Sequence, residues 1–139
     1  MKKKAIFFFL CLALLSGPCY TIAEAAEVWA SDILTSYTVA LAQGSSPGEL
    51  VVKYDVRCNA AATVGVESIV IYRSTGAYVT TITGTTSNGL LKDEAYRCSG
   101  TYTYQGTSGT YYYAIVTVSA DSGTIHDSRD ITTSTVKAP

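Results

Sequence analysis

The sequence has few charged residues, a single histidine and no long apolar run. Charged residues make up 15% of the 139 residues, they are scattered, and the formal net charge is −1. Because no basic stripe is present to neutralise phosphates, we expect no nucleic-acid partner. His126 is the only histidine and leaves too few ligands for a metal site, even together with two cysteine sulfurs. We therefore expect no metal and no cofactor.

The longest apolar run covers residues 5–15 and is shorter than the roughly 20 residues that a membrane-spanning helix needs. It follows three lysines and precedes the small-residue segment Ala23-Glu24-Ala25, a pattern typical of a secretory signal of bacterial style. We predict a signal peptide over residues 1–25, with Ala23 or Ala26 as alternative cleavage points. The remaining domain, residues 26–139, is then secreted, with no stable membrane insertion after cleavage.

A lipid anchor is the alternative location, because Cys19 follows the apolar run and an acylated cysteine would hold the chain at a membrane surface. Ser16 stands where such a motif requires an aliphatic residue, and Pro18 directly precedes the cysteine. We therefore favour the secreted form.

Two of the four cysteines, Cys58 and Cys98, remain after removal of the leader. An even number of cysteines in an exported chain favours a disulfide, which would restrain the unfolded chain by roughly 4 kcal/mol. Two buried free thiols are the alternative. Both cysteines fall on the apolar side of their strands, so we expect the bridge to join two facing sheets.

Strands are predicted throughout the chain after the leader. The stretch from Cys98 to Ala120 predicts two strands and a turn at residues 106–109, which we interpret as a hairpin. Apolar residues alternate with polar ones, which is the pattern of a half-buried strand. One face of the second strand carries Tyr112, Ala114, Val116, Val118 and Ala120, and one face of residues 49–58 carries Leu50, Val52, Tyr54, Val56 and Cys58.

Seven short strands are separated by turn signals, with no helical period after the leader. The predicted strands lie within residues 27–42, 49–58, 64–72, 77–83, 96–105, 111–120 and 124–136, and residues 59–63 are predicted as a loop. This pattern favours an all-β fold, specifically a two-sheet antiparallel sandwich. A small β-barrel is the alternative.

The segment from Tyr111 to Gly123, YYYAIVTVSADSG, resembles the penultimate strand and last hairpin turn of fibronectin type III and immunoglobulin-like modules. The resemblance covers about the last third of the chain. It implies a seven-stranded Ig-like β-sandwich of an exported protein. Adhesins, carbohydrate-binding modules and fibre subunits share this fold, so the fold does not choose among functions.

No residues in the sequence predict catalysis. His126, Asp127 and Ser128 are consecutive, so their side chains alternate between faces and cannot converge as a triad. Asp121 and Asp130, with Asp127, match no calcium-binding loop that we can justify. We therefore predict a protein that is not an enzyme, with a solvated turn or edge segment around His126.

Tyr111 and Tyr113 are the candidate ligand-binding residues, because they fall on the face opposite Ala114, Val116 and Val118. Exposed aromatic side chains on a flat sheet can stack on sugars or anchor a protein. Packing under a loop or against the second sheet is the alternative. We expect a non-enzymatic module that binds a surface glycan or protein. A structural subunit or accessory domain of a surface assembly is the second hypothesis, and a small secreted hydrolase or enzyme inhibitor is the third.

Overall fold

The computed structural model describes residues 32–139. The signal peptide predicted for residues 1–25, with Cys19, lies outside the described residues. Within residues 32–139, no helix is long and apolar enough to cross a membrane.

The described residues form seven strands, which confirms the prediction of an all-β fold. The strands are β1 (Leu34–Gln43), β2 (Glu49–Arg73), β3 (Tyr78–Thr83), β4 (Leu91–Gln105), β5 (Tyr111–Asp121), β6 (His126–Thr132) and β7 (Val136–Lys137).

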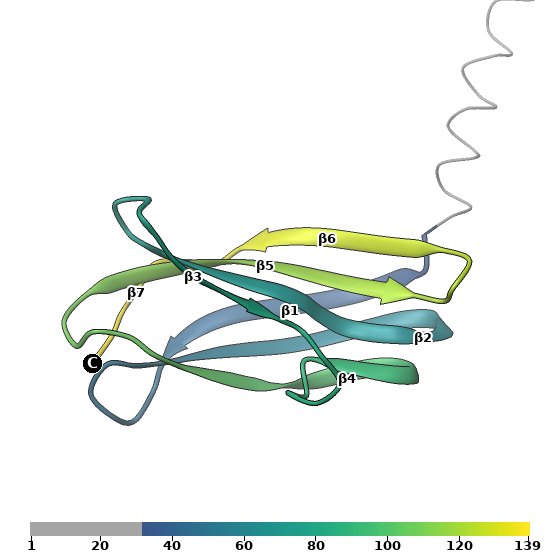
Figure 1. The fold of residues 1–139 in the computed structure, drawn as a ribbon, viewed down its shortest axis with the longest axis horizontal. Coiled ribbons are helices and arrows are strands. Elements are labelled where there is room, and N and C mark those ends of the chain that lie inside the picture. The colour runs from purple at the N-terminus through teal and green to yellow at the C-terminus, as the bar shows by residue number, and fades with distance from the viewer. Residues whose placement is uncertain (1–31) are drawn as a thin grey trace, which may run out of the picture. The chain divides into compact units, whose positions relative to one another are not determined.

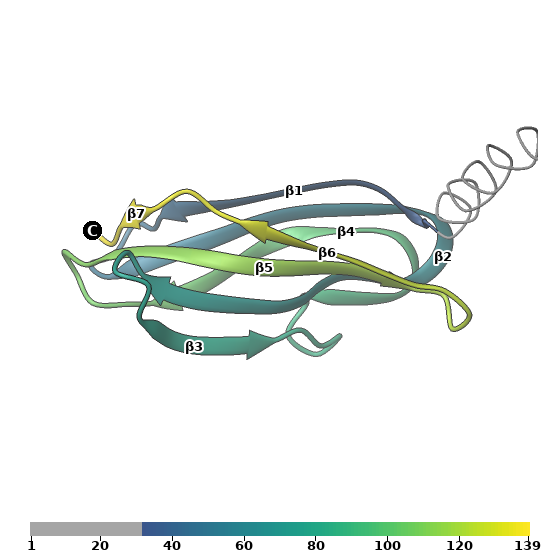
Figure 2. The same cartoon turned by 90° about the horizontal axis from the view of Figure 1, so that it is seen from above.

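Strand β2 is the centre of the fold, and all pairings are antiparallel (Figure 1). Its first half, residues 49–58, pairs with β1 on one side and with β4 on the other. Its second half pairs with β3 and β5, and β5 continues to β6 and β7. Figure 2 shows β3 beside β2 at the margin of the sheet. The sheet is thus curled around a single strand that takes part in two sets of pairings.

Both halves of β2 and all of β5 point one face into the same apolar core. The two sets of alternating residues that the sequence predicts as inward are buried, from Leu50 to Cys58 and from Tyr112 to Ala120. Val64, Val66, Ile69 and Ile71 from the second half of β2 join them, as does Leu90. Burying a side chain of this size contributes about 1.5–3 kcal/mol, so this cluster is the main source of stability.

The hairpin predicted between Cys98 and Ala120 is wrong. Strands β4 and β5 do not pair with each other, because each pairs with β2 instead, β4 mostly with residues 49–57 and β5 with residues 63–73. Residues 106–110 therefore connect the two sets of strands. The N–H groups of this connection donate to other segments, from Gly106 to the carbonyl of Gly48 at 2.8 Å and from Gly109 to that of Ala138 at 2.9 Å.

The loop predicted at residues 59–63 is also wrong, because the backbone stays extended there and β2 runs for 25 residues. Its pairing with β4 changes register between Arg57 and Ala62. Extra residues on one strand bend it and increase its twist. Beyond this irregular segment β2 no longer pairs with β1 and begins to pair with β5, while β4 still pairs with Ala62, Val64 and Gly65.

Cys58 and Cys98 are buried, and in the structure they are separate thiols. Cys98 pairs with Val56, so the two cysteines are diagonal neighbours on adjacent strands, not residues of two facing sheets as we expected. Diagonal residues lie about 7–8 Å apart, whereas a disulfide usually joins Cα atoms about 4.4–6.8 Å apart. A bridge would therefore require the strands to shift, and it stays a prediction.

Each thiol has a backbone carbonyl as a neighbour. The sulfur of Cys58 lies 3.1 Å from the oxygen of Ala60, and that of Cys98 lies 3.6 Å from the oxygen of Leu90. Burial raises the pKa of both thiols, so they are protonated donors at neutral pH.

Asp127 fixes the beginning of β1 to β6. Its carboxylate is buried and accepts the N–H groups of Ile33 at 3.1 Å and Leu34 at 3.0 Å, and it also pairs with Arg129. The segment that the sequence suggested was solvated thus contains a buried anchor, while its neighbour His126 is exposed.

Several glycines lie where a side chain would meet neighbouring atoms, and Gly100 and Gly84 are two of them. A side chain at Gly100 would lie 2.9 Å from the hydroxyl of Tyr54, which crosses β4 to donate to the carbonyl of Gly89. A side chain at Gly84 would clash with the carbonyl oxygen of Val66, which belongs to the rigid backbone of β2.

Candidate functional site

Four tyrosines gather on the outer face of three neighbouring strands. Because Tyr112 points into the core, Tyr111 and Tyr113 of β5 point outward, as predicted. The register places Tyr72 of β2 opposite Tyr113 and Tyr78 of β3 opposite Tyr72. We call Tyr72, Tyr78, Tyr111 and Tyr113 the tyrosine face.

Tyr72 and Tyr113 are packed against each other. Their ring centroids are 5.2 Å apart and their planes differ by 12°, which is a stacked pair. Stacking covers one face of each ring. Both side chains are half-buried. The pair therefore offers mainly ring edges and hydroxyl groups to a ligand.

Tyr78 has a different orientation. Its ring lies 6.2 Å from that of Tyr72 and is turned by 76°, an edge contact. Its hydroxyl lies 3.1 Å from Oγ1 of Thr81, which comes later in the same strand. The side chain therefore lies along β3, and with 62% of its surface exposed it is the most open of the four.

Tyr111 is 50% exposed and stands opposite Lys137 of β7. The ammonium nitrogen of Lys137 lies 5.8 Å from the centre of the Tyr111 ring, a cation–π distance. Of the two predicted residues, Tyr111 is thus open to solvent on part of its ring, whereas Tyr113 is held by Tyr72.

Two cations lie near the tyrosine face: Lys137 is opposite Tyr111, and the exposed Arg73 directly follows Tyr72 and is opposite Tyr112. The next row across the three strands and β6 consists of Thr81, Val70, Ile115 and Thr132. Beyond this row, the first acidic residue is Asp130 of β6, which pairs with Thr117 of β5. The face can stack, pack and exchange hydrogen bonds with a ligand.

The sequence analysis missed Tyr72 and Tyr78. Tyr72 ends the strand predicted at residues 64–72, and Tyr78 begins the one predicted at residues 77–83. The turn predicted at residues 74–76 could have identified them, because a hairpin there places the two tyrosines opposite each other.

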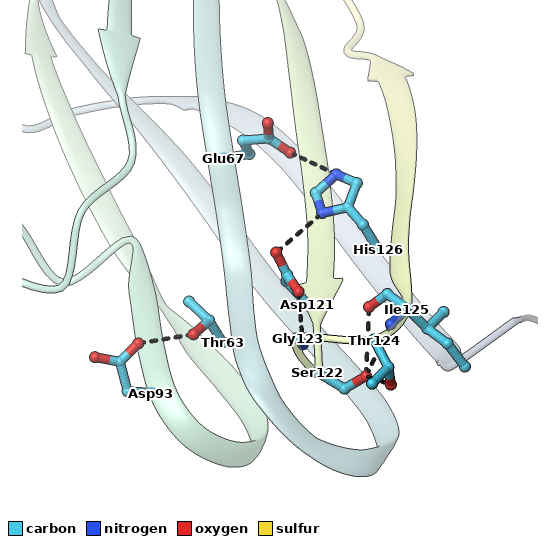
Figure 3. Close-up of polar contacts among 9 residues, drawn as sticks. All are labelled: Thr63, Glu67, Asp93, Asp121, Ser122, Gly123, Thr124, Ile125 and His126. Atoms are coloured by element: carbon cyan, nitrogen blue, oxygen red, sulfur yellow. Dashed lines mark hydrogen bonds and ion pairs between the residues drawn. The ribbon is translucent and has the colours of Figure 1, made fainter.

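The other end of the same outer face carries His126 (Figure 3). Its Nε2 lies 3.6 Å from a carboxylate oxygen of Glu67, and its Nδ1 lies 3.6 Å from one of Asp121. All three side chains are about half exposed. Asp127 lies on the opposite face of β6, bound to the start of β1, so His126, Asp127 and Ser128 do not converge.

A concavity of about 670 Å³ adjoins this end and is lined by Asp93, Glu94 and Asp121 among others. Two of these carboxylates already have donors: Thr63 donates to Asp93 at 2.8 Å, and the N–H of Gly123 to Asp121 at 2.8 Å. Within residues 32–139, no group of three or more His, Cys, Asp or Glu residues could hold a metal ion.

No protein-family model matches the chain. No curated protein matches it either. Among solved structures, the chain is similar to a family 76 glycoside hydrolase from a bovine Bacteroides thetaiotaomicron strain, with 19% sequence identity and a TM-score of 0.43. The match covers 75% of this chain and 20% of the hydrolase chain.

Proposed function

We propose that this protein is an exported, non-enzymatic module that binds a cell-surface or extracellular component through the tyrosine face. The observation that carries the proposal is the gathering of four outward tyrosines on β3, β2 and β5, two of them at least half exposed. Tyrosines are enriched at binding surfaces because a large apolar ring and a hydroxyl occur in one rigid side chain.

The finer architecture that we propose is an Ig-like sandwich of the fibronectin type III kind. One layer would consist of β1, the first half of β2 and β4, and the other of β3, the second half of β2, β5 and β6. The pairings support this division, because β1 and most of β4 pair with the first half of β2, β3 and β5 pair with the second half, and both halves contribute to one core. The tyrosine face would then be the outer surface of the four-stranded layer.

Export is proposed from the leader-like residues 1–25, with secretion favoured over a lipid anchor at Cys19. The mass of the protein recovered from its producing cells tests this proposal. Cleavage after Ala25 leaves a chain that begins at Ala26, whereas a chain that begins at an acylated Cys19 would overturn secretion in favour of the anchor.

Co-sedimentation with purified cell wall and with insoluble polysaccharides tests the binding function. The full chain is expressed with its own leader, purified, and compared with a variant that carries Tyr111→Ala and Tyr113→Leu. Leucine keeps an apolar contact with Tyr72, so the fold is retained. We expect saturable sedimentation, and about ten-fold weaker binding by the variant, since a buried aromatic anchor often contributes more than 1 kcal/mol.

The matched control carries Tyr37→Ala and Tyr96→Ala, which remove two exposed tyrosines from β1 and β4. Its binding should equal that of the unmodified protein. Equal loss in both variants, or no saturable sedimentation of the unmodified protein with any of these materials, would refute binding through the tyrosine face.

A structural role in a surface assembly is the second candidate, and the free strand edges favour it. Within residues 32–139, β1, β3, β4 and β6 each pair with one neighbouring strand, so each has an edge that a strand of another chain could extend. Gel filtration over a range of concentrations should then show a size that increases with concentration. A monomer at every concentration would refute it.

A further inference from the structure

We propose that the ligand of the tyrosine face is a neutral polysaccharide, and that the ring of Tyr78 is the surface on which one of its sugar rings stacks. The inference rests on the proposed binding function and adds the class of ligand and the principal contact. It depends on the different orientations of the four tyrosine rings.

Tyr78 is the most exposed of the four tyrosines. Its hydroxyl reaches Thr81 along the strand, so the ring lies down on β3. Its plane is turned by 76° from that of Tyr72, with the ring centroids 6.2 Å apart, so the two rings make an edge contact and are not stacked. A ring that lies on a strand and touches its neighbour by an edge leaves one broad face open, in agreement with its 62% exposure.

The other three rings are less suited to stacking on a ligand. Tyr72 and Tyr113 cover one face of each other. The ring of Tyr111 has the ammonium group of Lys137 over it at 5.8 Å. These residues would contribute hydroxyl groups and ring edges beside the sugar that stacks on Tyr78.

The chemistry around Tyr78 fits a neutral sugar. The face of an aromatic ring is electron-rich, and it attracts the weakly positive C–H groups on the flat side of a pyranose. The outward residues that follow Tyr78 along β3 are Thr81 and Thr83, whose hydroxyls can both donate to and accept from sugar hydroxyls. A neutral chain that follows β3 would meet one stacking surface and then a row of hydroxyl groups.

Titration of the purified full chain with soluble polysaccharides tests the inference. The neutral probes are mixed-linkage β-glucan, xylan and soluble starch, and polygalacturonate is the charged comparison. We expect saturable binding to at least one neutral probe, and at least about ten-fold weaker binding to that probe by Tyr78→Ala. Tyr78→Phe keeps the ring face, so we expect it to stay within about three-fold, and Tyr78→Trp should bind at least as tightly.

Tyr96→Ala is the control, because Tyr96 is 60% exposed and lies on β4, away from the tyrosine face. Unfolding curves show whether each variant is folded. Unchanged binding by Tyr78→Ala, or an equal loss in Tyr78→Phe and Tyr78→Ala, would overturn stacking on this ring.

The two proposals fail in different ways. If cell wall retains the protein and the Tyr111→Ala, Tyr113→Leu variant loses retention, yet no neutral polysaccharide binds, the tyrosine face is a binding site for another class of ligand, such as a protein. If retention is the same with and without the tyrosines, binding through the tyrosine face is refuted, and the inference about Tyr78 is refuted with it.

Discussion

Replacement of Asp127 by alanine should destabilise the protein far more than its position beside an exposed histidine suggests. The substitution removes the acceptor of two backbone N–H groups, those of Ile33 and Leu34, and one of the partners of Arg129. Ile33 itself is buried, so water cannot easily replace the carboxylate there.

The magnitude follows from the groups left without a partner. A buried donor that loses its acceptor costs about 1–3 kcal/mol. The N–H of Leu34 is only partly buried and Arg129 is partly exposed, so both recover part of their hydrogen bonding from water. We therefore expect a loss of about 2–4 kcal/mol in the free energy of unfolding. Asp127→Asn keeps an oxygen acceptor but loses the charge, so its loss should be about half as large.

Urea unfolding of the purified protein measures this free energy, with Asp130→Ala as the control. Asp130 lies on the same strand and accepts a hydrogen bond from Thr117 at 2.7 Å, but it is exposed, so its removal should cost less than about 1 kcal/mol. Hydrogen exchange adds a local measurement: the amides of Ile33 and Leu34 should exchange slowly in the unmodified protein and rapidly in Asp127→Ala. Equal effects of the two alanine substitutions, with unchanged exchange of these amides, would refute the anchor.

Thiol titration of the denatured, unreduced protein should find no free sulfhydryl, and two would refute the predicted bridge between Cys58 and Cys98. In the reduced protein, burial raises the pKa of both thiols, so the native state keeps protons that the unfolded state releases. The contribution of the thiols to the free energy of unfolding should therefore be constant below the ordinary thiol pKa of about 8.5 and should fall at higher pH, and the double alanine variant should lose this part of the slope. Gly84→Ala should lower the free energy of unfolding by more than Gly100→Ala, because the backbone carbonyl of Val66 cannot move as the ring of Tyr54 can. Overpacking typically costs about 1–3 kcal/mol. Urea unfolding measures both variants, and the reverse order would contradict this packing.

Which residues face the core could be predicted from the sequence, whereas which strands pair could not. Alternation identifies Leu50 to Cys58 and Tyr112 to Ala120 as inward residues, because the period of a strand is local. The same alternation fits a hairpin and a connection between two sets of strands equally well. The short turn after Gln105 therefore suggested that β4 pairs with β5. In the structure both strands pair with β2 instead.

Long-range contacts explain the other differences. From its own strand alone, Asp127 resembles a solvated residue. Its role depends on Ile33, 94 residues earlier in the chain, whose N–H donates to its carboxylate. Tyr72 and Tyr78 become part of the tyrosine face only once β2, β3 and β5 are aligned, although Tyr111 and Tyr113 were recognisable from their own strand. Two of the four residues of the tyrosine face could therefore be predicted from the sequence.

The central place of β2 has a consequence for how the chain folds as it is made. Strands β1 and β3 are its neighbours in sequence, so a chain that emerges from the N-terminal end can complete both pairings as soon as Thr83 has appeared. At that stage the edges of β2 that later receive β4 and β5 are still unpaired, and such edges recruit strands from other chains. Aggregation of the emerging chain should be greatest in this interval and should decrease once residues through Asp121 have emerged, because β4 and β5 then cover these edges of β2.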